Sequence, residues 1–78
     1  MDANGAPEAV PEIEVRVNGR ALALPADTTV AELVARMAAG TPMVAVERNG
    51  EIVPRDRWGE SAVAAADQFE IVRFVQGG

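Results

Sequence analysis

The chain has 78 residues, enough for one small domain, and carries a net charge of −5 from 12 acidic residues and 7 arginines. A negative chain is poorly suited to bind nucleic acid or anionic membrane surfaces, because their phosphates repel it. Cysteine, histidine, lysine and tyrosine are absent, which removes most side chains that act as nucleophiles, bases or metal ligands. We therefore expect no catalysis by the chain alone and no metal site. The chain has no apolar run long enough to suggest a membrane segment, so we expect it in the cytoplasm. We also expect it to be a monomer when free.

The last residues, Gln76-Gly77-Gly78, carry the chemistry that we expect of this chain. Two glycines have no Cβ, so they make a narrow and pliable end that suits entry into the active site of another protein. We predict that the main-chain carboxylate of Gly78 is the reacting group, with Gly77 and Gln76 as its tail. At the other end, residues 1–11 mix Gly, Pro, Ala and acids without periodicity and are predicted to be a flexible leader.

Residues 12–76 are predicted to form one domain that begins with a strand hairpin. Apolar and charged residues alternate from Glu12 to Val17, as in a strand with one buried face. Asn18-Gly19 follows, and this pair accepts the positive φ values of a tight type I′ turn. The next run, Arg20 to Leu24, is therefore predicted to pair with the first strand.

A helix is predicted after the hairpin. Thr29 and Glu32 fit a capping box, in which each side chain bonds the backbone amide of the other residue. Gly40 is predicted to follow the last turn. One apolar stripe of the helix is expected to cover the hairpin, with Met37, like Met43 further on, filling gaps in the core. The stripe consists of Val30, Leu33, Val34 and Met37.

Three more strands are predicted in the second half of the chain. Met43 to Arg48 reads as the third strand. Asn49-Gly50 offers a second tight turn into a short strand at Glu51 to Val53. Residues 55–68 have no clear period and are predicted to be a loop with one helical turn. The last strand is predicted from Phe69 to Val75.

This order of elements, ββαββ followed by a loop and β, predicts an α+β fold. The helix needs a sheet on which to bury its apolar stripe, and the first and last strands are rich in β-branched residues. We expect a mixed sheet of about five strands with these two at its centre and one helix on one face. That is the β-grasp, or ubiquitin-like, arrangement.

The last strand also predicts where partners bind. Glu70, Val72 and Phe74 share one face, opposite to that of Phe69 and Ile71. An unpaired glutamate is costly to bury, so this face should meet solvent and leave two apolar side chains exposed beside the tail. The alternative is that Phe74 folds over the sheet edge into the core. The predicted partner-binding residues are Val72 and Phe74 with Ala45 beside them and Arg73 and Arg55 at the rim.

Several stretches of the chain match one known family, and together they cover nearly all of it after the leader. They are Val17-Asn18-Gly19, Thr29-Val30-Ala31-Glu32-Leu33, Val44-Ala45-Val46, Asn49-Gly50-Glu51-Ile52-Val53-Pro54-Arg55 with Trp58, Asp67-Gln68 and Gly77-Gly78. The sequence therefore resembles the thiamine-biosynthesis sulfur carriers of the ThiS family. Within the most specific match we expect Trp58 to plug the core beneath the long loop. Ala66 departs from the family, which usually has glycine before the aspartate.

This resemblance implies a carrier cycle that ends at Gly78. An E1-like adenylating enzyme of the ThiF type would use ATP to adenylate the carboxylate, and sulfur from a sulfur donor would displace AMP. The resulting thiocarboxylate would give its sulfur to a thiazole synthase of the ThiG type. The carrier itself would bind no cofactor and catalyse no reaction.

Two other functions stay open at this point. The small subunit of molybdopterin synthase shares the fold, the acidic character and the diglycine, but usually lacks the Val-Pro-Arg-x-x-Trp segment, which favours the ThiS family. A ubiquitin-like protein modifier would join Gly78 to lysines of other proteins. Because this chain has no lysine, it cannot form polymers through its own lysines.

Overall fold

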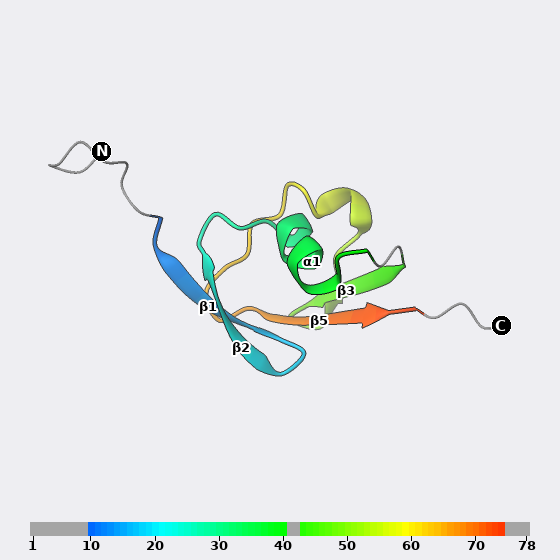
Figure 1. Cartoon of the computed structure of the whole chain (residues 1–78), viewed down its shortest axis with the longest axis horizontal. Helices are drawn as coiled ribbons and strands as arrows, with labels where there is room; N and C mark the ends of the chain where they lie inside the picture. Colours follow the sequence, from blue (N-terminus) through cyan, green and yellow to red (C-terminus); the bar gives the residue numbers. More distant parts are fainter. Residues whose placement is uncertain (1–9, 41–42, 75–78) are drawn as a thin grey trace, which may run out of the picture.

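The computed structural model describes residues 10–40 and 43–74. Most of the predicted leader and the tail residues Gln76, Gly77 and Gly78 lie outside the described residues. In the described part, the fold is the predicted β-grasp, with one main helix packed on a mixed sheet (Figure 1).

The first hairpin forms as predicted. Strands β1 (Glu12–Val17) and β2 (Arg20–Pro25) pair in antiparallel register along their whole length. The turn between them has Asn18 at φ 51° and Gly19 at φ 84°. Positive φ at both positions is the type I′ geometry, whose twist matches that of the two strands.

Helix α1 (Val30–Ala38) begins at the predicted capping box. The Glu32 amide donates to Thr29 Oγ1 at 3.1 Å, and the Thr29 amide donates to Glu32 Oε1 at 2.9 Å. Gly40 follows the helix at φ 79°, a left-handed conformation that glycine adopts without a Cβ penalty.

The second half of the chain supplies β3 (Val44–Arg48), β4 (Glu51–Ile52), the short 3₁₀ helix η1 (Arg55–Arg57) and β5 (Gln68–Arg73). The turn between β3 and β4 repeats the first one, with Asn49 at φ 52° and Gly50 at φ 86°. The single helical turn predicted within the long loop corresponds to η1.

The described strands form one five-stranded sheet in the order β2-β1-β5-β3-β4. As predicted, the first and last strands are neighbours, and they run parallel. On its other side β5 is antiparallel to β3. Helix α1 crosses one face of this sheet, and β5 runs beneath it toward the end of the fold farthest from β2 (Figure 1). The last strand therefore lies in the middle of the sheet.

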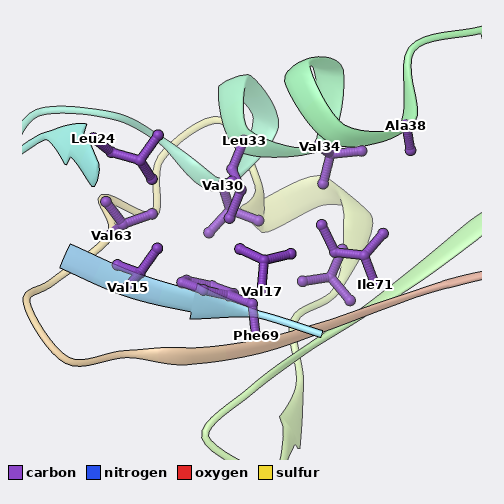
Figure 2. Packing of buried hydrophobic residues seen from close by; sticks show 11 residues of the cluster. Val15, Val17, Leu24, Val30, Leu33, Val34, Ala38, Val63, Phe69 and Ile71 are labelled. Carbon is purple, nitrogen blue, oxygen red and sulfur yellow. The ribbon is translucent and has the colours of Figure 1, made fainter. Parts of the chain in front are cut away.

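The core lies between α1 and the sheet, where side chains from both layers point toward one another (Figure 2). Phe69 is the largest fully buried side chain, and it lies under Leu33 and Val30 of the helix. The buried apolar residues are Val15, Val17, Leu24, Val30, Leu33, Val34, Ala38, Val46, Val63, Phe69 and Ile71.

The two methionines expected in the core are not buried. Met37 is 38% exposed and Met43 is 41% exposed, so that prediction is wrong for both. On a helix, the positions three and four residues beyond Val34 both continue the stripe, and the buried one is Ala38. Met43 alternates with the inward-facing Val44 and therefore points to the opposite face of the sheet.

Within residues 10–40 and 43–74, no helix is both long enough and apolar enough to span a bilayer.

Candidate functional site

The start of β5 is fixed by Asp67, the one buried charged side chain of the described residues. Its Oδ2 pairs with Arg48 Nη2 at 2.7 Å and accepts the Ala64 amide at 2.8 Å. Its Oδ1 accepts Asn49 Nδ2 at 3.0 Å. The same Asn49 side chain accepts the Gln68 amide at 2.9 Å, so the second turn is bonded directly to the first residues of β5.

Hydrogen bonding decides the charge of Asp67. Burial by itself raises the pKa of this carboxyl, but the hydrogen bonds from Asn49 and Ala64 and the positive charge of Arg48 outweigh it. The pKa of Asp67 therefore lies below its ordinary value. The carboxylate is ionised at neutral pH and holds three segments together: the end of β3, the long loop and the start of β5.

Ala66 precedes this cluster in a left-handed conformation, with φ at 69°. Its amide donates to Glu14 O at 2.8 Å, so the strained position is also tied to β1. A Cβ group is unfavourable at positive φ. This is the position at which glycine was expected from the family resemblance, and the backbone geometry explains that preference.

The middle of β5 is held by Asn18, which the sequence predicted only as a turn residue. Its side chain donates from Nδ2 to Ile71 O at 3.2 Å and accepts the Ile71 amide on Oδ1 at 2.8 Å. Its backbone amide donates to Phe69 O at 2.8 Å. One asparagine thus satisfies both backbone groups of Ile71 in place of a strand partner.

The end of β5 pairs with β3 through residues that face away from α1. Val72 lies opposite Ala45, and the Phe74 amide continues the ladder by donating to Met43 O at 2.9 Å. Side chains opposite each other on antiparallel strands share a face. Val72 is 46% exposed and Phe74 is 53% exposed, so neither belongs to the core. The predicted exposure of both residues is confirmed.

Ile52 extends the same apolar area onto β4. It pairs with Glu47 of β3, two residues from Ala45, and is 62% exposed. The residue alternation of β3 would have placed Met43 on this face, whereas the position of Ile52 depends on strand register, which the sequence did not give. We call this area the open-face patch. It consists of Met43, Ala45, Ile52, Val72 and Phe74.

The two predicted rim arginines lie on the opposite side of the sheet. Arg73 follows the alternation of β5 and donates from Nη2 to Met37 O of α1 at 3.1 Å. The guanidinium of Arg55 lies 5.0 Å from the ring centre of Trp58. Both residues are therefore on the helix side, and the prediction that they flank Val72 and Phe74 is wrong. For Arg73 the reason is that one strand position reverses the face, and for Arg55 it is that η1 packs beside α1.

Trp58 has the structural role expected for it. It is half-buried, packs against the core, and donates from Nε1 to Val53 O at 2.9 Å. Arg55 and Trp58 line a shallow apolar groove together with the alanines of α1. The Val-Pro-Arg-x-x-Trp segment thus closes the loop onto the helix.

The described residues hold the last strand as far as the point where the predicted tail begins. In the described part of the chain, no group of acidic residues could hold a metal ion. The carboxylate of Gly78 and its neighbours Gly77 and Gln76 lie outside the described residues, so their predicted role rests on sequence. What the described residues provide is a firmly anchored last strand with an exposed apolar surface at its end.

Comparison with known proteins identifies the family. The sequence profile of the ThiS family matches residues 12–78. The chain belongs to the ThiS family. The Bacillus subtilis sulfur carrier protein ThiS is 37% identical over 65 residues, which cover 82% of this chain and 98% of that protein. The family predicted from the sequence is therefore confirmed.

Two further relatives are named thiazole synthase. The one from Paramagnetospirillum magneticum is 40% identical over 62 residues, covering 80% of this chain and 19% of that protein. The one from Magnetococcus marinus is 33% identical over 66 residues, covering 85% of this chain and 20% of that protein. The chain thus spans about a fifth of the length of these two proteins, each of which includes a ThiS-like segment.

The fold is shared with a solved member of the family. The crystal structure of the thiamine biosynthesis protein ThiS from Geobacter metallireducens has a TM-score of 0.70 and 30% sequence identity to this chain. The alignment covers 85% of this chain and all of that one. The predicted β-grasp fold is confirmed both by this likeness and by the sheet and helix described above.

Proposed function

We propose that this chain, a ThiS-family sulfur carrier of thiamine biosynthesis, takes up and delivers sulfur on the main-chain carboxylate of Gly78. The observation that carries the proposal is that the family match continues through Gly77-Gly78. The other two functions considered from the sequence, a molybdopterin-type carrier and a protein modifier, are not needed to account for any feature of the described residues.

The chemistry requires a partner enzyme. A terminal carboxylate has a pKa near 3.5, so it is an anion at neutral pH and resists attack. Adenylation by an E1-like enzyme of the ThiF type converts one carboxylate oxygen into part of a good leaving group, with ATP supplying AMP and releasing pyrophosphate. A sulfur donor in the persulfide state then attacks the carbonyl and AMP leaves. A thiol next attacks the remaining sulfur–sulfur bond, which releases the thiocarboxylate and leaves the thiol joined to the donor in a disulfide. The carrier supplies no catalytic side chain.

The thiazole synthase is proposed as the acceptor of this sulfur. Two relatives with that name contain a segment similar to this chain, which links the two proteins in one polypeptide. We infer that the open-face patch contacts the partner enzymes. Its exposed apolar side chains lie next to the point where the tail begins, so docking there would hold the tail at a fixed distance from an active site.

We also propose that the carrier works as a monomer in the cytoplasm, where ATP is available to the activating enzyme. Its net charge of −5 gives no reason to expect a nucleic acid or a membrane surface among its partners.

Intact-mass spectrometry tests the proposal directly. The chain is incubated with the adenylating enzyme of the same organism, ATP and a sulfur donor. Replacement of one carboxylate oxygen by sulfur should raise the mass by about 16 Da, and fragmentation should locate the change at Gly78.

A variant lacking Gly78 serves as the matched control and should show no gain of mass. The proposal is contradicted if the unmodified chain keeps its mass although the same enzyme preparation adenylates a known sulfur carrier. A gain of mass that maps to another residue would also contradict it.

A further inference from the structure

The last strand has a backbone edge that begins where the pairing of β1 with β5 ends. The register of the parallel pair covers only Arg16 with Gln68 and Val17 with Phe69. After Val17 the chain enters the turn of the first hairpin, whereas β5 continues for several residues past it, beside β3 (Figure 1). The second half of β5 therefore has a strand partner on one side only.

Asn18 covers this edge for one residue. Its side chain bonds both the N–H and the C=O of Ile71, as a neighbouring strand would. These bonds also show which way the backbone groups point, because Ile71 directs both of them toward the β1 side. Along a strand, residues two positions apart direct their backbone groups to the same side.

Arg73 is the next residue with this orientation. The Phe74 amide bonds to Met43 O, which places Phe74 in a bonded pair with β3 and Arg73 in the alternate position that faces away from β3. Outside the strand ladders of the described residues, no backbone hydrogen bond reaches the N–H or C=O of Arg73, and the register with β3 turns both groups away from that strand. Arg73 is an exposed residue, and β1, the neighbour of β5 on this side, pairs with β5 only as far as Phe69.

An accessible strand edge is a site at which an extended segment can add by main-chain pairing. We propose that a segment of the thiazole synthase pairs with the β5 edge at Arg73 and extends the sheet on the side that β1 leaves open. Its alternate side chains would reach the open-face patch, since Val72 and Phe74 flank Arg73 on that face. This proposal rests on the proposed function, because it assigns the contact that holds the tail-bearing strand to the acceptor enzyme.

Proline at position 73 tests the main-chain contact. Arg73→Pro removes the N–H and the side chain together, while Arg73→Ala removes only the side chain, including its bond to Met37 O. The register of β5 with β3 directs the N–H of Arg73 away from β3, so proline deletes no bond of that ladder. The residue before it is in a strand, which suits a position preceding proline.

We expect Arg73→Pro to bind the thiazole synthase of the same organism at least about 10-fold more weakly than Arg73→Ala, because the acceptor on the partner is left unsatisfied. Binding is measured by calorimetry, and the melting temperatures of both variants are compared first. Equal affinities for the two variants would overturn the proposal.

Amide hydrogen exchange on the unmodified chain gives a second readout that needs no substitution. The Arg73 amide should exchange rapidly in the free chain and at least about 10-fold more slowly in the complex. Unchanged exchange in a saturated complex would overturn the edge contact but leave the proposed function standing. A complete lack of binding by the unmodified chain would overturn the proposed acceptor, and the inference with it.

Discussion

Phe69, near the start of β5, and Phe74, the residue that follows the strand, are the two phenylalanines of the chain and lie in opposite surroundings. Phe69 is 1% exposed at the centre of the core, and Phe74 is 53% exposed beside the tail. The strand is bonded to the Asn49 side chain at Gln68 and to the Asn18 side chain at Ile71, whereas beyond Ile71 its edge on the β1 side has no strand partner. The comparison shows that β5 stabilises the fold as far as Ile71, whereas the exposed apolar side chains of Val72 and Phe74 lie at and just beyond its end.

The largest expected effect is on the buried half. Phe69→Ala should lower the free energy of unfolding by about 3–5 kcal/mol, because it removes a fully buried ring and leaves a cavity. The matched substitution Phe74→Ala should cost less than about 1 kcal/mol, since most of that ring already contacts water. Urea titration followed by tryptophan fluorescence measures both. Similar losses for the two variants would contradict the contrast between the buried start of β5 and the exposed residues at its end.

The polar anchor of the buried half gives the next effect. Asp67→Ala should lower the free energy of unfolding by about 1–3 kcal/mol, because Arg48 and the Ala64 amide lose a charged partner. Glu70→Ala, on the exposed face of the same strand, should change it by no more than about 0.5 kcal/mol. If Asp67→Ala proves as mild as Glu70→Ala, the cluster does not anchor the strand.

Acid should weaken the same anchor in a defined pH range. The pKa of Asp67 is lowered in the folded chain, so its contribution to stability is fully present above the unfolded aspartate value of about 3.9 and is lost as the pH falls through the folded value. The stability of the unmodified chain relative to Asp67→Asn should be constant between about pH 7 and pH 5 and decrease below about pH 4. A difference that stays constant into strong acid would show that the carboxylate titrates alike in both states.

The smallest expected effect is a gain. Ala66→Gly should raise the free energy of unfolding by about 0.5–1 kcal/mol. Glycine removes the cost of holding a Cβ at φ 69°, and this gain is larger than the loss from the greater freedom of glycine in the unfolded chain. Ala35→Gly, in the middle of α1, should instead lower it by about 1 kcal/mol. Destabilisation by both substitutions would mean that the position of Ala66 carries no strain.

The sequence predicted those parts of the fold that depend on local preferences. Both Asn-Gly turns, the capping box at Thr29 and the alternation of β5 follow from residues within a few positions of one another, and all are present. The exposure of Val72 and Phe74 could be predicted for the same reason, since a single glutamate in the strand identified its solvent face.

Features that depend on distant residues could not be predicted in this way. The Asn18 side chain bonds Ile71, 53 positions further along the chain, and a turn preference gives no sign of that contact. The cluster around Asp67 joins segments 18 or 19 residues apart, and the place of Ile52 on the open face depends on the register of β4. Arg73 was misplaced because closeness in sequence was taken as closeness on one face, and Arg55 because its packing on Trp58 depends on how the long loop folds back.

The central claim is that residues at the end of β5 bind partner enzymes, whereas the rest of the strand stabilises the fold. One double variant tests this claim most directly. Val72→Ser with Phe74→Ser replaces two exposed apolar side chains by small polar ones. We predict that the free energy of unfolding changes by less than about 1 kcal/mol, while transfer of sulfur from the thiocarboxylate to the thiazole synthase slows at least about 10-fold. Unfolding of the variant, or transfer at the unmodified rate, would contradict the account.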